Sequence, residues 1–174
     1  MENVISSKIV FECPIFKVEE AEVELPDGKR EFRWYVVKRE AVGIIPVDSD
    51  GNILLTREYR SASGGIRWRI PAGGVKDGEY FEDAARRELR EEIGMDCSDL
   101  KLILEAKDPS AMIKQTSYFY LARGLYPSPL SSEEWEHIEV TPRKPSEVLE
   151  LLRSGEFQGN IAKALGKAVS VLAP

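Results

Sequence analysis

The chain has 174 residues, and 43% of them are hydrophobic, which is enough apolar material for one domain with a sizeable core. The formal net charge of −6 argues against a protein that coats nucleic-acid phosphates, because such a protein needs a basic face. No apolar run reaches the roughly 18 residues of a membrane span, and the N-terminus lacks a signal-peptide layout, so we expect a cytoplasmic protein without membrane contacts. Neither the two cysteines nor the single histidine has the spacing of a metal or redox site.

The first forty residues predict a small antiparallel sheet. Residues 7–12 and 15–25 have strand character, Pro26 to Lys29 favours a hairpin turn, and residues 31–39 return as a third strand. Such a sheet has little core of its own and usually packs on a neighbouring domain or on a second subunit. We therefore expect a β extension over residues 1–40 beside a main domain over residues 41–174. Trp34 in the third strand is either a core side chain or a ring that stacks on a nucleotide base.

The main domain opens with two predicted strands. Residues 41–47 are nearly all apolar and predict a strand buried on both faces. Residues 53–60 predict the next strand, with Arg57 and Arg60 near its end, and residues 61–74 are expected to form a loop. Arginines at a strand end usually face solvent, but a guanidinium beside a phosphate site can make bidentate contacts with phosphate oxygens.

Residues 73–95 hold the densest cluster of charges in the chain. Gly73, Gly74 and Gly78 indicate a turn, residues 80–93 are mostly good helix formers, and Gly94 suits a left-handed helix stop. At about 100° per residue, the apolar side chains of this helix form one arc that faces the body of the protein. Three acids fall inside or at the edge of the same arc: Glu88, Glu91 and Glu92.

Three inward carboxylates are unfavourable unless a cation joins them. Like charges three or four residues apart on a helix cost about 0.2–0.5 kcal/mol per pair, and more when they lose water. A divalent cation would neutralise them, and oxygen ligands without nearby Cys or His favour Mg²⁺ or Mn²⁺ over Zn²⁺. Because Mg²⁺ commonly completes its shell with waters and substrate phosphates, the pattern indicates a metal-assisted phosphate site.

The second half of the chain predicts strands at residues 100–106, 116–125 and 137–143, and helices at residues 145–154 and 159–172. An acidic, turn-rich stretch with Glu133, Glu134 and Glu136 precedes the last strand. The elements together predict one mixed α/β (α+β) domain with an N-terminal extension.

The order Gly73, Glu79, Arg87-Glu88-Leu89, Glu91-Glu92 and Gly94-Met95 matches the Nudix box at every defined position, so the chain resembles the Nudix hydrolases. The resemblance implies an αβα sandwich with a mixed sheet, in which this loop and helix hold one to three Mg²⁺ ions against a diphosphate linked to some group X. By position, the implied metal ligands are Glu88, Glu91, Glu92 and the carbonyl of Ala72. The residues implied to brace the box are Gly73, Glu79, Arg87 and Gly94.

Looser motifs outside the box resemble the branch of ADP-ribose and nucleoside-diphosphate-sugar pyrophosphatases. These motifs are VELPDGKREF, AVGIIPVDSDGNILLTREYR, IPAGG and EHIEVTPRKPSEVLELLRSGE. This branch implies a homodimer whose N-terminal strands cross to the partner, with Arg60, Arg57 and Trp34 as candidate contacts to a nucleotide substrate. The chain departs from the branch at Arg69, where a Glu is common, and in the loop that begins with Pro109-Ser110-Ala111. Hydrolysis of some nucleoside diphosphate linked to X is therefore a safer expectation than ADP-ribose in particular.

The expected mechanism is attack of an activated water on one phosphorus while Mg²⁺, held by the box glutamates, clamps the diphosphate. A general base would assist the water, and the candidates are a box acid, Glu91 or Glu92, or the mobile acid Glu136. Two alternatives stay open. One is a MutT-like nucleoside triphosphate pyrophosphohydrolase, and the other is a Nudix module that binds a nucleotide sugar without cleaving it.

Overall fold

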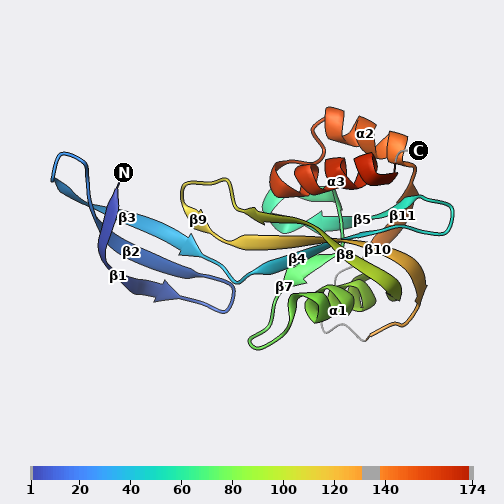
Figure 1. Ribbon diagram of the computed structural model, residues 1–174, viewed down its shortest axis with the longest axis horizontal. Helices are drawn as coiled ribbons and strands as arrows, with labels where there is room; N and C mark the ends of the chain where they lie inside the picture. The colour runs from blue at the N-terminus through green and yellow to red at the C-terminus, as the bar shows by residue number, and fades with distance from the viewer. Residues whose placement is uncertain (1, 131–137, 173–174) are drawn as a thin grey trace.

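The computed structural model describes residues 2–130 and 138–172, arranged as a layered body with a β arm at one end (Figure 1). The strands are β1 (Asn3–Glu12), β2 (Lys17–Glu24), β3 (Arg30–Val37), β4 (Ala41–Pro46), β5 (Ile53–Arg60), β6 (Gly65–Arg69), β7 (Ala72–Gly74), β8 (Met95–Lys107), β9 (Ile113–Lys114), β10 (Thr116–Pro127) and β11 (Glu139–Arg143). The helices are the 3₁₀ turn η1 (Ser61–Ser63), α1 (Phe81–Ile93), α2 (Pro145–Arg153) and α3 (Gly159–Leu172).

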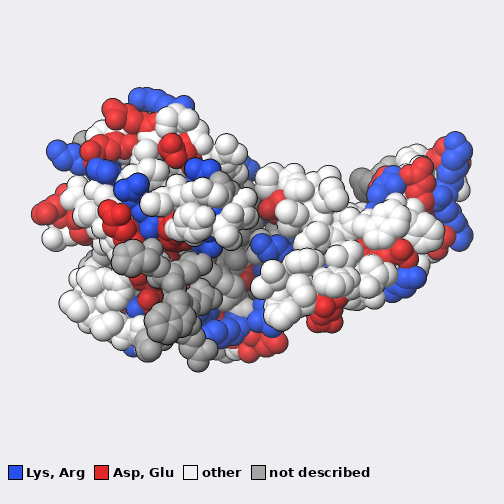
Figure 2. Space-filling model, turned by 180° about the vertical axis from the view of Figure 1, so that it is seen from behind, with Lys and Arg blue, Asp and Glu red and all other residues white. Residues whose placement is uncertain are grey.

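The arm is a four-stranded sheet in the order β1-β2-β3-β9. Its β2–β3 hairpin turns as expected at Gly28, whose φ of +81° suits glycine. The short β9 comes from the main body and pairs parallel with β3, and Val36 N–H also donates to the Met112 carbonyl at 2.8 Å. All ten residues of the edge strand β1 are exposed, and the arm projects away from the body (Figure 2).

The central sheet has the order β7-β4-β10-β8, and β4 pairs parallel with β10. Val42 and Ile44 of β4 pack with Leu89 of α1, whereas Ile45 faces the other way and packs with Leu165 of α3. Alternate residues thus face different helix layers, as expected for a strand buried on both faces. The outcome is a mixed sheet with α1 on one side and α2 and α3 on the other (Figure 1).

A second sheet of the body has the order β11-β5-β6. The expectation of a loop over residues 61–74 is wrong, because this segment contains β6 and β7. Gly64 adopts a left-handed φ of +65°, which lets the chain reverse after η1 so that β6 pairs antiparallel with β5. The alternation of apolar and charged residues from Ile66 to Ile70 was the available strand signal.

Among the described residues, the structure has no helix that is long and apolar enough to cross a membrane.

Candidate active site

Helix α1 carries the charged cluster and has the predicted extent. Tyr80 is its extended N-cap residue, and Glu82 and Asp83 lie in the first turn, where negative charge complements the helix dipole. The helix ends at Gly94, whose φ of +70° is left-handed and whose N–H donates to the Leu89 carbonyl. The predicted helix stop at Gly94 is confirmed.

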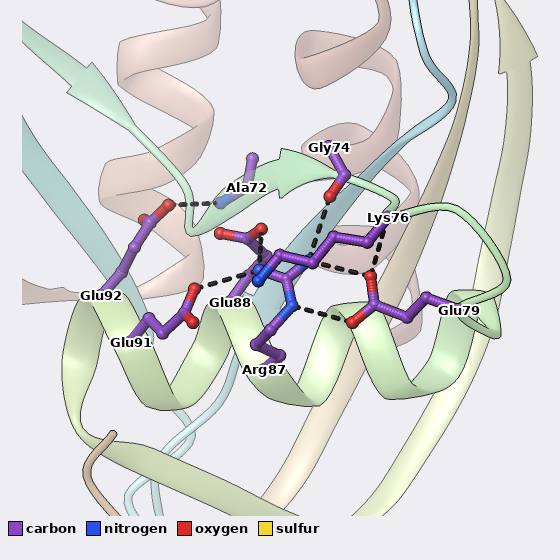
Figure 3. A network of polar contacts seen from close by, with 8 residues as sticks. All are labelled: Ala72, Gly74, Lys76, Glu79, Arg87, Glu88, Glu91 and Glu92. Atoms are coloured by element: carbon purple, nitrogen blue, oxygen red, sulfur yellow. Dashed lines mark hydrogen bonds and ion pairs between the residues drawn. The ribbon is translucent and has the colours of Figure 1, made fainter. Parts of the chain in front are cut away.

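Arg87 lies at the centre of the polar network (Figure 3). Its guanidinium donates to both carboxylate oxygens of Glu79, at 2.8 and 3.0 Å, and to the Gly74 carbonyl at 3.0 Å. Nη1 also donates to Glu88 Oε1 at 2.5 Å and to Glu91 Oε2 at 3.0 Å. The hydrogen bonds with Glu79 raise the pKa of Arg87 and lower the pKa of Glu79. These contacts join the turn to the helix, which is the arrangement expected of a brace.

Glu88 is buried against the backbone of Gly73. A Cβ at Gly73 would lie 2.1 Å from Glu88 Oε1 and 2.4 Å from Oε2, so the carboxylate occupies the space that any side chain there would need. The φ of Gly73 is not positive, so the close approach of Glu88, rather than backbone conformation, is what requires glycine.

Glu92 is the most strongly perturbed acid of the site. Its Oε1 accepts a hydrogen bond from the Ala72 N–H at 3.2 Å, and its buried Oε2 has no hydrogen-bond partner. Burial raises the pKa of Glu92 to about 8, and the negative charges of Glu58 and Glu88 act in the same direction. Hydrogen bonding to Ala72 and the charge of Arg60 oppose this shift.

The register of β7 determines where the Ala72 carbonyl points. Two backbone hydrogen bonds define the pairing here: Ile44 N–H donates to the Pro71 carbonyl, and Val75 N–H donates to the Glu40 carbonyl. In an antiparallel ladder, hydrogen-bonded and non-hydrogen-bonded pairs alternate. Ala72 and Gly43 come next to the Pro71–Ile44 pair and are therefore a non-hydrogen-bonded pair. The polar groups of Ala72 therefore point away from β4. Its N–H contacts Glu92, and in a strand the carbonyl of the same residue points to the same side.

These residues fit a hard divalent cation. The available donors are the carboxylates of Glu88, Glu91 and Glu92 and the carbonyl of Ala72, and the buried Oε2 of Glu92 lacks a partner. Within residues 2–130 and 138–172, no three acid, His or Cys side chains converge as a ready-made metal cluster. Since Mg²⁺ typically needs only one or two protein carboxylates, and waters or substrate phosphates supply the rest, the donor set suffices.

The structure brings Arg60 to this site but not Arg57. Arg60 Nη2 donates to the buried Glu58, and the charges of both residues affect the pKa of Glu92. Arg57 instead lies over the Trp68 ring at 5.3 Å and pairs with Glu139 at 3.7 Å.

Trp34 belongs to the arm and not to the carboxylate site of its own chain. Trp34 lies on β3 of the arm, is 52% exposed and donates to Glu20 at 3.1 Å, so it is not a core side chain of the protomer. The interpretation of Trp34 as a base-stacking ring stays a prediction. Glu136 lies outside the described residues.

Sequence reasoning missed Glu58, which is only 2% exposed. Thr56 Oγ1 donates to its Oε1 at 2.7 Å, and Arg60 donates to its Oε2 at 2.5 Å. The available signal was the alternation in β5, where an acid stands between two polar positions of the same face.

Models of two protein families match this chain. A model of the NUDIX domain matches residues 37–164, most of the chain. The chain belongs to the Nudix family. A model of the nucleoside diphosphate sugar hydrolase N-terminal domain matches residues 2–37, the part that forms the arm.

Individual Nudix relatives align over most of the chain. The ADP compounds hydrolase NudE of Escherichia coli is 27% identical over 157 residues, which cover 89% of this chain and 84% of that protein. The ADP-ribose pyrophosphatase of Bacillus subtilis is 28% identical over 157 residues, covering 89% and 85%. That of Mycobacterium tuberculosis is 33% identical over 124 residues, covering 71% and 60%.

A crystal structure of an ADP compounds hydrolase matches with a TM-score of 0.87 at 25% identity, covering 98% of this chain and 94% of that one. The predicted Nudix-type α/β fold is thereby confirmed, and so is the class of the enzyme, a pyrophosphohydrolase. Nudix hydrolases generally use divalent metal ions, in agreement with the oxygen-rich donor set.

Proposed function

We propose that this Nudix enzyme hydrolyses the diphosphate bond of ADP-ribose or a related nucleotide sugar, giving a nucleoside monophosphate and a sugar phosphate. The observation that carries the proposal is the close approach of two α1 carboxylates, Glu88 and Glu92, to the Ala72–Gly74 backbone, with Arg87 bonded to that backbone and to Glu91 (Figure 3). Several relatives are named as hydrolases of ADP compounds or of ADP-ribose, and they support this substrate class.

The proposed ligands of the cation are Glu88, Glu91, Glu92 and the Ala72 carbonyl, with one to three Mg²⁺ ions per site and Mn²⁺ as a substitute. A divalent cation, when bound, neutralises charge on the diphosphate oxygens and lowers the pKa of a coordinated water. Arg87 holds Glu88 and Glu91 in place, and the Ala72 N–H orients Glu92.

In the proposed reaction a water attacks one phosphorus, and the bridging oxygen leaves with the other product. The water loses a proton to a nearby acid, for which the candidates are Glu91, Glu92 and Glu136. The Arg60 guanidinium would stabilise negative charge on the phosphates, because its planar donors match phosphate oxygens. With ADP-ribose the products would be AMP and ribose 5-phosphate.

We also propose that the arm, within residues 1–40, is a dimerisation element attached to a Nudix domain formed by residues 41–174. The edge strand β1 exposes Val4, Ile9 and Phe11, which are 55%, 49% and 52% exposed. A long, exposed, apolar edge strand favours pairing with another chain. In the proposed homodimer, a second copy of this protein would cover strand β1 and would bring Trp34 of the arm close to the neighbouring subunit.

The test is a substrate panel of ADP-ribose, other nucleotide sugars, dinucleoside polyphosphates and nucleoside triphosphates, incubated with Mg²⁺ or Mn²⁺ and resolved by chromatography. The proposal predicts cleavage of ADP-ribose or a nucleotide sugar between the two phosphorus atoms. A clear preference for triphosphates would contradict the substrate class but not the family, and binding without any cleavage would indicate a non-catalytic module.

A further inference from the structure

A cavity of about 760 Å³ opens between the edge strand β6 and the chain that joins α2 to α3. On the sheet side it is lined by Arg60, Arg67 and Arg69. On the helix side it is lined by the chain between α2 and α3, including Ser154 and Gln158. This volume lies in the range that holds small-molecule ligands. We call it the arginine cavity.

Strand register explains why the arginines gather there. Arg69 pairs with Thr56 and Arg67 pairs with Glu58 across the β5–β6 ladder, so these side chains share one face with Arg60. Three arginines thus share one face of the ladder with the buried Glu58, to which Arg60 donates a hydrogen bond. Among the described residues that line the cavity, three are arginines and one, the exposed Glu156 on the helix side, is an acid.

Arg60 links this cavity to the metal site. Arg60 lines the cavity, its guanidinium donates to Glu58, and its charge opposes the rise in the pKa of Glu92. If a diphosphate held at the α1 carboxylates contacts Arg60, as proposed above, a substrate that continues past Arg60 reaches the arginine cavity. In a protein with a net charge of −6, a local excess of arginine is an attractive site for an anion.

We propose that the arginine cavity binds a further phosphoryl group, carried by the substrate beyond the diphosphate that is cleaved. This inference rests on the proposed function and narrows its substrate to nucleotides whose X group bears its own phosphate. Arg67 and Arg69 are the specificity-determining residues, because guanidinium forks match phosphate oxygens in pairs. The phosphate belongs either to a phosphorylated sugar or to the continuing chain of a dinucleoside polyphosphate.

The experiment compares kcat/KM for ADP-ribose, for ADP-ribose phosphorylated on its terminal ribose, and for a dinucleoside polyphosphate. The variants are Arg67→Gln and Arg69→Gln, with Arg153→Gln as a matched control, since Arg153 is an exposed arginine next to the cavity that does not line it. Circular dichroism establishes that each variant is folded.

The parent enzyme should prefer one of the two phosphate-bearing substrates over ADP-ribose by about 10- to 100-fold, the range of a charge-assisted hydrogen bond. Arg67→Gln and Arg69→Gln should lower this preference about tenfold or more, and Arg153→Gln should retain it. The preferred substrate identifies the source of the phosphate. Equal kcat/KM for all three substrates, or a preference that survives both cavity variants, overturns the inference while leaving the proposed function intact.

A binding measurement separates the two proposals if none of these compounds is cleaved, an outcome that would contradict the proposed function itself. Inorganic tripolyphosphate is titrated calorimetrically into the parent protein and the same three variants without added metal. Binding that weakens in Arg67→Gln and Arg69→Gln but not in Arg153→Gln supports an anion site in the arginine cavity. Absence of binding, or equal binding in all four proteins, contradicts the proposed anion site in the arginine cavity.

Discussion

The carboxylate of Glu88 occupies the space where a side chain at Gly73 would lie, with only 2.1 Å between an added Cβ and Glu88 Oε1. A side chain at position 73 would therefore displace the Glu88 carboxylate from its position. The position of a proposed metal ligand depends on the absence of a single methyl group.

Gly73→Ala should therefore reduce turnover about 100-fold, because displacing a catalytic group by about 1 Å can have this effect. The matched control is Gly74→Ala. A Cβ at Gly74 meets nothing within 4 Å, so its turnover should stay within a few-fold of the parent. Steady-state kinetics at saturating Mg²⁺ checks both. Equal effects of the two substitutions would show that the contact with Glu88 is unimportant.

Arg87→Lys should destabilise the protein and lower its activity although the charge is kept. Lysine cannot reproduce the fork that binds both oxygens of Glu79 together with the Gly74 carbonyl. We expect a loss of roughly 1–3 kcal/mol in the free energy of unfolding. Chemical denaturation measures it, with Arg90→Lys as the control, since the Arg90 side chain on the same helix makes a single hydrogen bond among the described residues, to the Ser128 carbonyl. A smaller loss of unfolding free energy for Arg87→Lys than for Arg90→Lys would contradict the role of Arg87 in bracing the turn against the helix.

Glu92 should make the metal-free protein less stable as pH rises. The folded pKa of about 8 lies above the ordinary value of 4.5, so the folded state binds the proton more tightly than the unfolded state. This contribution is fully present below about pH 4.5 and is lost as pH rises through about 8. Glu92→Gln should remove the slope and stabilise the metal-free protein at pH 8 by about 2–4 kcal/mol. Urea denaturation in EDTA tests this, and parallel pH profiles for parent and variant would refute it.

Glu92→Gln should also lower turnover at saturating Mg²⁺ by orders of magnitude while the fold stays intact. In the parent, a chelator should abolish activity and added Mg²⁺ should restore it. A cation that binds only the folded state should raise the melting temperature, and this rise should shrink in Glu88→Gln and Glu92→Gln. Near-normal turnover of Glu92→Gln, or activity that persists in a chelator, would exclude the proposed role.

Val4→Lys combined with Ile9→Lys should convert a dimer to a monomer. Both side chains lie on one face of the arm, because their β2 partners Val23 and Glu19 are four residues apart. Val171→Lys is the matched control, since Val171 is also exposed, at 51%, but belongs to helix α3 and not to the arm. Light scattering coupled to gel filtration gives the mass. A parent protein that is already monomeric would rule out the proposed homodimer.

Several elements could be read from local sequence. The limits of α1, its left-handed stop at Gly94 and the buried strand β4 agree with prediction, because apolar periodicity and a helix cap depend on neighbouring residues. Strand β6 was not predicted, because the glycines on either side of it are typical of a loop. Arginines 57 and 60 looked equivalent in the sequence, yet they lie in different surroundings, since successive strand residues point to opposite faces.

The sequence by itself determined the family, the helix that carries the acids and the kind of cation they suit, since the residue types and their spacing on one helix are local properties. Only the tertiary structure decided that Glu58 and Arg60 act on Glu92, that Gly73 must accommodate Glu88, and that Arg67 and Arg69 line one cavity. The physical reason is that these relationships arise from strand register and from packing between distant segments, which no local pattern encodes.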